Sequence, residues 1–300
     1  MRIGLEYNSL MNLLEVNGLS KKFGSVEALH NVSFTIEAGH IFGFLGPNGA
    51  GKSTTIRTIM GFLHPSAGNV TIFGLDSIAH SVELKEKIGY VPAEPVLYQD
   101  WTVDEHIGFL ANVRGGDIHA KANELKKLLE LDGGKKVKQL STGNQQKLAI
   151  VLALAIAPEL LILDEPTRGL DPLLRSTFHK LLRQYKLDGG TVLLSSHDLS
   201  EVEDLCDKIV IIHNGKLIQD TTVTRLRSNH GHKIKAHFVD GTPDLTKLKD
   251  IDDLVTTPHT AVFTVRGSLQ PALEILAKHN VEDLEITSAS LEDIFEEIYT

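Results

Sequence analysis

Gly46-Pro47-Asn48-Gly49-Ala50-Gly51-Lys52-Ser53-Thr54 lies between an apolar run at residues 41–45 and a helical pattern at residues 56–63. It matches the pattern G-x-x-x-x-G-K-[ST], in which glycines let backbone N–H groups surround a phosphate without Cβ clashes. The loop leads into a helix N-terminus, where unpaired donors and the helix dipole favour an anion. We therefore expect all nine residues to bind ATP, with Lys52 at the β- and γ-phosphates and the Ser53 hydroxyl on Mg²⁺. A chance glycine-rich turn would lack this strand–loop–helix context.

A second motif, Leu160-Leu161-Ile162-Leu163-Asp164-Glu165-Pro166, is an apolar strand that ends in two carboxylates. Such a strand end can hold Asp164 beside the metal of a phosphate-loop enzyme. Glu165 is then placed to polarise the attacking water as a general base. Taken alone, the motif fits a solvated acidic turn equally well, and its position downstream of the phosphate loop favours the catalytic interpretation.

Short apolar runs alternate with helical patterns through about residue 226, which is typical of a parallel sheet covered on both faces. The expected buried strands are residues 41–45, 88–91, 160–163, 191–195 and 209–213. The expected helices are residues 56–63, 120–131, 145–157, 173–187 and 200–206. Both motifs fall at the carboxyl ends of strands, where the active sites of such sheets lie.

A polar stretch at residues 228–232 (SNHGH) predicts a boundary, and residues 233–300 have a different pattern. There, residues 233–239, 261–265 and 284–287 are expected strands, and residues 269–278 an amphipathic helix. Ser290 and Asp293 are expected to cap a last helix at residues 291–299. We expect an extension at residues 1–12, an α/β domain at residues 13–228 and a small α+β domain at residues 233–300. The small domain has no recognisable chemical motif.

The composition is that of a globular protein. The chain has 300 residues, 42% of them hydrophobic and 23% charged. The net charge of −9 argues against a nucleic-acid partner, because phosphate binding favours a basic face. One cysteine, Cys206, fits a reducing compartment. The longest apolar run is residues 148–157, too short for a membrane span, so we expect any membrane role to act through a partner.

Three further motifs extend this pattern. Leu140-Ser141-Thr142-Gly143-Asn144-Gln145-Gln146-Lys147 precedes the acidic strand, Gly169-Leu170-Asp171-Pro172 follows it, and Ser195-Ser196-His197-Asp198 ends the next strand. In this order, and with Phe23 in Lys22-Phe23-Gly24, the chain resembles the ATP-binding-cassette (ABC) ATPases over about residues 13–226. The resemblance implies that family's fold, in which a parallel core is joined by an antiparallel β subdomain and a helical subdomain, here at about residues 98–158.

The resemblance also implies roles for these residues. Phe23 stacks on adenine, Asp171 lies in the dimer loop, and His197 contacts the γ-phosphate. The catalytic set is Glu165, His197 and Lys52, and the metal ligands are Ser53 and Asp164. The signature residues Ser141, Thr142, Gly143 and Asn144 close over the ATP of a second copy in a head-to-tail dimer. The helix that begins near Asn144 suits this role because its N-terminus is an anion site without a lysine.

The sequence departs from the usual family pattern at four positions. Ala93, followed by Glu94, stands where the family has a metal-binding glutamine, so Glu94 is the alternative ligand. Thr142 and Asn144 replace glycine and glutamine in the signature, and Arg168 replaces a serine. These changes, and the ending at residues 288–295, resemble the branch of exporter ATPases for drugs, antibiotics and lantibiotics.

The resemblance predicts an ATP-hydrolysing subunit of a membrane exporter that works in the cytoplasm, at the inner face of the membrane. Its partners would be a second or homologous cassette subunit and a separate transmembrane permease. The permease is expected to dock around residues 93–102 and the helical region up to residue 131. Tyr98 and Trp101 fit such a docking surface, and equally fit ordinary core aromatics.

Two alternatives remain at this point. A soluble ABC ATPase acting on ribosomes or nucleic acid usually has two cassettes, long coiled coils or zinc sites, and the sequence has none of these. A binding-only regulatory cassette predicts loss of Lys52, Glu165 or His197, all of which are present. The transported substrate is not encoded in these motifs.

Overall fold

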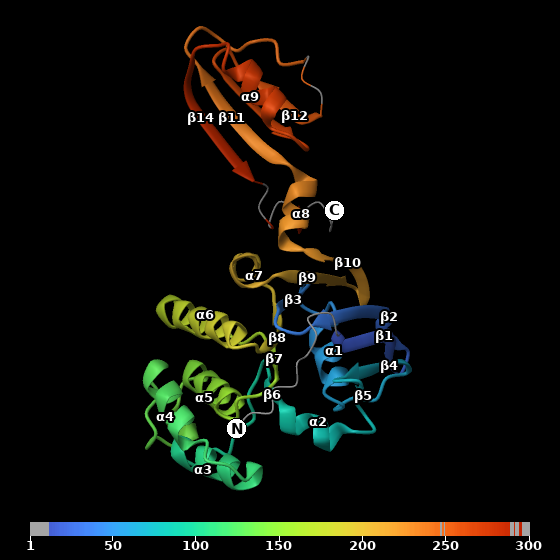
Figure 1. The fold of residues 1–300 in the computed structure, drawn as a ribbon, viewed down its shortest axis with the longest axis vertical. Helices are drawn as coiled ribbons and strands as arrows, with labels where there is room; N and C mark the ends of the chain where they lie inside the picture. The colour runs from blue at the N-terminus through green and yellow to red at the C-terminus, as the bar shows by residue number, and fades with distance from the viewer. Residues whose placement is uncertain (1–11, 247, 249, 289–290, 292–293, 296–300) are drawn as a thin grey trace. The chain divides into compact units, whose positions relative to one another are not determined.

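The computed structural model describes residues 12–246, 248, 250–288, 291 and 294–295. They fall into two compact units that divide between Asp220 and Thr221 (Figure 1). The expected extension at residues 1–12 lies outside the described residues except for Asn12. The expected last helix at residues 291–299, with its caps Ser290 and Asp293, also lies outside them except for residues 291, 294 and 295.

A six-stranded sheet forms the centre of the first unit, with strand order β10-β9-β3-β8-β7-β6. The strands are β3 (Ile41–Leu45), β6 (Ile88–Val91), β7 (Leu160–Asp164), β8 (Thr191–Ser196), β9 (Lys208–His213) and β10 (Lys216–Thr222). The neighbours β6–β7, β7–β8, β8–β3 and β3–β9 are parallel. Five of the six strands were predicted to within one residue, because strands buried on both faces are continuous apolar runs.

An antiparallel sheet of order β2-β1-β4-β5 packs on one face of the central sheet. It consists of β1 (Asn12–Phe23), β2 (Val26–Glu37), β4 (Ala67–Ile72) and β5 (Leu75–Asp76). Alternate residues of the central strands, such as Phe42, Phe44 and Ile162, share one core with its inward residues. The rings of Phe34 and Phe44 are 5.3 Å apart in this core. The antiparallel subdomain implied by the resemblance is confirmed.

The helices of this unit are α1 (Lys52–Ile59), α2 (Ser81–Lys87), α3 (Val103–Arg114), α4 (His119–Leu128), α5 (Thr142–Ala155), α6 (Pro172–Leu187) and α7 (Leu199–Leu205), with a 3₁₀ turn η1 (Val137–Gln139). Helices α3, α4 and α5 pack together beside β6, while α6 and α7 pack on β8 (Figure 1). The prediction of a helix at residues 56–63 was wrong by four residues. The helix begins at Lys52, directly after the phosphate loop, and ends before Gly61, which has a positive φ of 68°.

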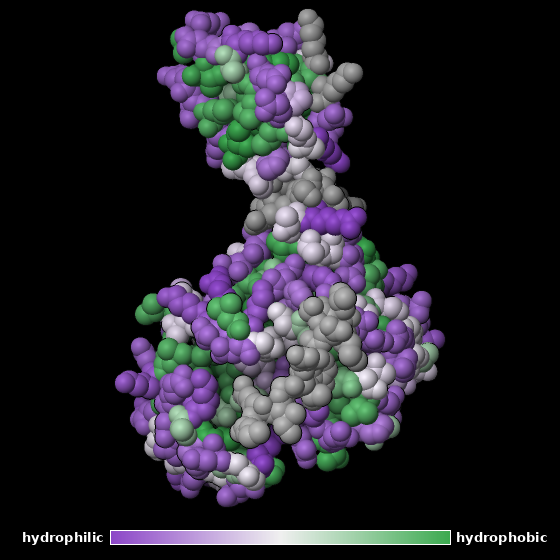
Figure 2. Space-filling view, in the orientation of Figure 1, coloured by the Kyte–Doolittle hydropathy of each residue, from purple (hydrophilic) through white to green (hydrophobic). Residues whose placement is uncertain are grey.

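The second unit contains α8 (Val223–His230), β11 (His232–Phe238), β12 (Ile251–Thr256), β13 (Thr260–Val265), α9 (Gln270–Leu276) and β14 (Val281–Ser288). Its antiparallel sheet has the order β12-β13-β11-β14, and α9 packs on the core formed by β11 and β13. Figure 2 shows hydrophobic residues at the surface of this unit, and Leu284 and Ile286 of β14 are partly exposed. Part of the expected break at residues 228–232 is helical, because α8 continues to His230.

Candidate functional site

The phosphate loop connects the end of β3 to the start of α1. Gly46 is required at its first position, because a Cβ there would lie 2.3 Å from the main-chain oxygen of Ile212. Gly51 takes a positive φ of 111° as the N-cap of α1, a conformation that favours glycine. Pro47, Asn48 and Gly49 form the exposed tip, and Ala50 returns to the core. The loop conformation is therefore set by its glycines.

The donors of the loop suit a polyphosphate. Lys52, Ser53 and Thr54 form the first turn of α1, where backbone N–H groups lack intrahelical acceptors. The Lys52 ammonium is buried and donates to the main-chain oxygens of Gly46 (2.6 Å) and Pro47 (3.2 Å). Burial lowers the pKa of Lys52 below its ordinary value, while the charges of Glu165 and Asp164 act in the opposite direction. A buried cation surrounded by these donors fits the phosphates of ATP.

The three predicted catalytic side chains meet, and the carboxylate oxygen of one lies between the other two. Glu165 Oε1 lies 3.6 Å from Lys52 Nζ and 3.5 Å from His197 Nδ1. The backbone of Glu165 has a φ of 49°, which is uncommon for a residue with a side chain and is typical of functional positions. Its N–H donates to the main-chain oxygen and the hydroxyl of Ser195, both at 3.1 Å. The neighbouring strand thus holds this strained residue in place.

Asp164 lies beside Glu165 in a different environment. Its side chain is buried, and Oδ1 accepts a 2.6 Å hydrogen bond from the Ser195 hydroxyl. Oδ2 is also buried and has no hydrogen-bond donor among the described residues. A buried carboxylate oxygen without a donor, together with the Ser53 hydroxyl on α1, fits the oxygen ligands that Mg²⁺ requires. The described residues contain no cluster of three or more histidine, cysteine or acidic side chains that suits a metal.

The predicted signature residues begin helix α5. Ser141 is the N-cap, and its hydroxyl accepts from the N–H of Asn144 at 3.3 Å. Ser141 and Thr142 are exposed, while Gly143 packs so closely on the main chain of Gly169 that a Cβ would lie 2.3 Å from Gly169 O. The predicted signature and the predicted dimer loop are therefore in direct contact within one chain.

The remaining predicted residues lie around this centre. Asp171 is exposed and caps the N-terminus of α6, where it accepts from the N–H of Leu174 at 3.0 Å. Phe23 ends β1 with its ring half exposed and the Lys21 ammonium 5.0 Å from the ring centroid. The exposed Glu94 carboxylate pairs with Arg168 at 3.3 Å, so its use as a metal ligand stays a prediction.

The aromatic pair before α3 is partly exposed. The rings of Tyr98 and Trp101 stack at 4.3 Å, and the Trp101 ring contacts Phe109 of α3 at 5.4 Å. Tyr98 and Phe109 are exposed, and Trp101 is half-buried. The pair is therefore neither an interior core nor a fully solvated surface.

Ser195 is a site residue to which the sequence analysis gave no role. Its hydroxyl donates to Asp164 and its main chain accepts from Glu165. Residues 164 and 195 are register partners on the parallel strands β7 and β8. Only that register brings them together, and the one sequence signal is a serine at the end of an apolar strand.

Comparisons with known proteins agree with this geometry. The family model described as "ABC transporter" matches residues 29–168. The bacitracin transport ATP-binding protein BcrA of Bacillus licheniformis is 32% identical over 95% of this chain and 97% of its own length. The linearmycin resistance ATP-binding protein LnrL of Bacillus subtilis (strain 168) is 38% identical over 73% of this chain and 72% of its own.

Solved structures give the same result. A structure of an ATP-binding subunit of an ABC transporter has a TM-score of 0.68 and 34% identity, covering 72% of this chain and 92% of that one. The cassette MJ0796, solved as a post-hydrolysis dimer bound to ADP and Pi, has a TM-score of 0.65 and 27% identity, covering 70% of this chain and 98% of that one.

The chain belongs to the ABC transporter ATP-binding proteins. It is thus an ATP-binding and ATP-hydrolysing transporter subunit, built on a P-loop α/β fold with an additional small α+β unit. Within the part of the chain that the structure describes, every helix is too short or too polar to cross a membrane.

Proposed function

We propose that this chain powers export through a separate transmembrane permease, by closing with a second cassette around ATP and reopening after hydrolysis. The second cassette is another copy or a homologous subunit, arranged head to tail. The relatives named for bacitracin transport and linearmycin resistance support export, and the dimeric cassette structures support the closure. The chain would then work in the cytoplasm and reach the membrane through the permease.

One observation carries this proposal: Glu165 Oε1 lies 3.6 Å from Lys52 Nζ and 3.5 Å from His197 Nδ1. In the proposed site, Lys52 and the loop N–H groups hold the phosphates, and Phe23 stacks on adenine. Glu165 accepts a proton from the attacking water, and His197 donates to the γ-phosphate as charge develops. Mg²⁺ on Ser53 and Asp164 would neutralise phosphate charge, which is its usual contribution to phosphoryl transfer.

The second cassette would complete the site. Ser141 and the first N–H groups of α5 form an anion site without a lysine. Such a site suits the ATP that the phosphate loop of the other copy already holds. Asp171, exposed at the start of α6, would lie at the same interface. Residues 93–102, with the exposed Tyr98, and the following helical region up to residue 131 are the proposed docking surface for the permease. We also propose domains at residues 13–228, with a helical subdomain at about 98–158, and at residues 233–300.

The variant Glu165→Gln tests the proposal, because it keeps the shape of the side chain and removes the proton acceptor. We expect it to bind ATP, to dimerise in its presence and to lose turnover by at least about a hundredfold, the range of a general base. The measurements are steady-state phosphate release and particle mass by light scattering with ATP and Mg²⁺. Normal turnover in this variant would refute the assignment of the base.

A second measurement addresses the partner. Affinity purification of the full chain from detergent-solubilised membranes should recover a polytopic membrane protein. Recovery of ribosomes or nucleic acid in its place would support the soluble alternative and refute the exporter assignment.

A further inference from the structure

The segment that carries His197 is attached to other elements on both sides. Ser196 precedes His197, and its hydroxyl donates to Glu201 Oε2 of α7 at 2.6 Å. Asp198 follows His197, and its Oδ2 accepts from Arg175 Nη1 of α6 at 3.0 Å. Asp198 is also the N-cap of α7. The backbone position of His197 therefore depends on side chains of α6 and α7.

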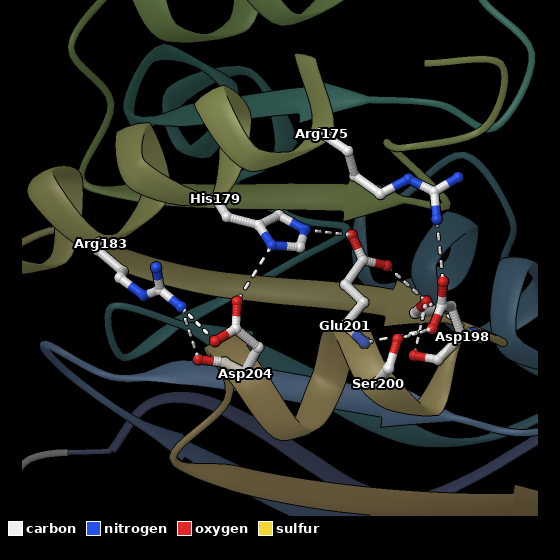
Figure 3. A network of polar contacts seen from close by, with 8 residues as sticks. Arg175, His179, Arg183, Asp198, Ser200, Glu201 and Asp204 are labelled. Atoms are coloured by element: carbon white, nitrogen blue, oxygen red, sulfur yellow. Dashed lines mark hydrogen bonds and ion pairs between the residues drawn. The ribbon is translucent and has the colours of Figure 1, made fainter. Parts of the chain in front are cut away.

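Figure 3 shows that these contacts belong to two facing rows of ionisable side chains, which we call the α6–α7 rows. The basic row recurs every four residues and so lies along one face of α6. The acidic row recurs every three residues along α7 and its N-cap. The pairs are Arg175 with Asp198 (3.0 Å), His179 Nε2 with Glu201 (3.3 Å), His179 Nδ1 with Asp204 (3.3 Å), and Arg183 Nη2 with the Asp204 main-chain oxygen (3.2 Å).

The middle of these rows is buried. Glu201 is only 2% exposed, and a buried carboxylate is costly unless hydrogen-bond donors satisfy it. Its side-chain partners are the Ser196 hydroxyl and the His179 ring. His179 therefore stabilises the carboxylate that anchors the residue before His197.

At the N-terminal end of α6, Arg175 depends in the same way on one partner, Asp198. Arg175 Nε is buried and has no acceptor among the described residues, so Asp198 is the group that balances this guanidinium. The N–H of Arg175 also donates to the main-chain oxygen of Asp171 at 2.9 Å, one helical turn earlier. One turn of α6 thus connects the dimer-loop residue to the anchor of His197.

We propose that Arg175 and His179 are positioning residues that hold His197 at the site, through Asp198 and through Glu201 with Ser196. A shift of Asp171 at the contact with a second cassette is then transmitted along α6 to His197. This inference rests on the role proposed above for His197. Neither residue contacts the reacting atoms, so their effect is on geometry rather than on chemistry.

The test compares Arg175→Gln with Lys186→Gln in the purified full chain. Lys186 pairs with Asp207 at 2.6 Å, with side chains 32% and 31% exposed, against 38% and 32% for Arg175 and Asp198. Both pairs join a cation of α6 to an aspartate, and their side chains are similarly exposed. They differ in that Asp198 is next to His197 in the chain and Asp207 is not. We expect Arg175→Gln to lower the kcat for ATP about tenfold at unchanged KM, because a misplaced group can cost up to about a hundredfold. Lys186→Gln should keep kcat within about twofold.

Two further variants separate positioning from folding. Arg175→Lys keeps the charge and should restore kcat to within about threefold of the parent. His179→Gln keeps a donor for Glu201, whereas His179→Ala removes it and should be the slower of the two. Thermal unfolding measured on every variant checks that losses of turnover do not follow losses of stability. Equal losses in Arg175→Gln and Lys186→Gln, or losses that follow stability alone, would overturn the inference.

A double-mutant cycle shows whether Arg175 acts through His197. In the His197→Ala background, Arg175→Gln should cause no further loss, because both changes remove the same contribution. A second tenfold loss in that background overturns the positioning role and leaves the role of His197 intact. Unchanged turnover in His197→Ala alone overturns both, so the two failures are distinguishable.

Discussion

The contact between the start of α5 and the loop before α6 can be tested by adding one methyl group. Gly143 is the second residue of α5, and a Cβ there would lie 2.3 Å from the main-chain oxygen of Gly169. The obstacle is backbone, which cannot rotate away as a flexible side chain can. Gly143→Ala must therefore displace the end of α5 or the loop that leads to Asp171.

The expected magnitude follows from two opposing effects. Alanine is better than glycine inside a helix by about 1 kcal/mol. Gly108 in α3 shows that gain alone, because nothing lies within 4 Å of a Cβ placed there. At Gly143 the clash exceeds the gain. Overpacking costs about 1–3 kcal/mol, and a main-chain oxygen at 2.3 Å places the cost at the upper end, about 3 kcal/mol. We expect a net loss of about 2 kcal/mol for Gly143→Ala and a gain of about 1 kcal/mol for Gly108→Ala.

Thermal unfolding followed by circular dichroism at 222 nm measures both variants. For a unit of this size about 1 kcal/mol corresponds to roughly 2–4 °C. Gly143→Ala should lower the midpoint by roughly 4–8 °C, and Gly108→Ala should raise it by roughly 2–4 °C. A rise in Gly143→Ala equal to that in Gly108→Ala would refute the close backbone contact.

Two further predictions follow from titratable groups. Burial raises the pKa of Asp198, but hydrogen bonds from Ser200 and the Glu201 N–H and the charge of Arg175 outweigh it, so that the net pKa lies below its ordinary value. A lowered folded-state pKa stabilises the fold above the unfolded pKa of about 3.9, and this stability is lost as the pH falls through the folded value. Asp198→Asn keeps the N-cap and should unfold at lower urea than the parent at pH 7, with the difference shrinking below about pH 4; a constant difference from pH 7 to pH 3 would contradict this. Burial raises the pKa of the Cys206 thiol well above its ordinary value, so at pH 8 a disulfide reagent such as DTNB should label the native chain far more slowly than the urea-unfolded chain. Equal labelling rates would show that Cys206 is accessible.

The central strands were predictable because each is a short run of apolar residues bounded by polar ones. The long strands β1 and β2 were not predicted from their residues, and only the resemblance implied them. Their outer faces are solvated and their register shifts several times, which breaks a clean alternation. Their pairing is decided by packing on the central sheet.

Helix α3 was expected only as part of the helical subdomain, although its start could have been predicted from the sequence. Thr102 and Glu105 form a capping box in which each side chain accepts from the other's backbone N–H. This is the S/T-x-x-E pattern at a helix N-terminus. By contrast, the local signals of β12 and α8 are weak. Half of the residues of Ile251–Thr256 are polar, and the start of α8 is marked only by its N-cap Thr222, whose hydroxyl accepts from the N–H of Arg225.

The phosphate loop, the acidic strand end and the order of the motifs were determined by the sequence alone. Each depends on residues adjacent in the chain: glycines that bend the loop, a lysine beside them, and carboxylates directly after an apolar strand. The identity of the protein as an ABC ATPase followed from these local patterns.

The contacts between motifs were decided only by the tertiary structure. One carboxylate oxygen of Glu165 lies close to both Lys52 and His197. The reason is that β3, β8 and β7 are parallel neighbours whose carboxyl ends meet at one edge of the sheet. The same geometry pairs Asp164 with Ser195, and the packing of α7 beside α6 creates the rows that anchor His197. Sequence spacing shows which residues share one face of a helix, but it does not show strand register or which helices pack together, so these distances required the folded chain.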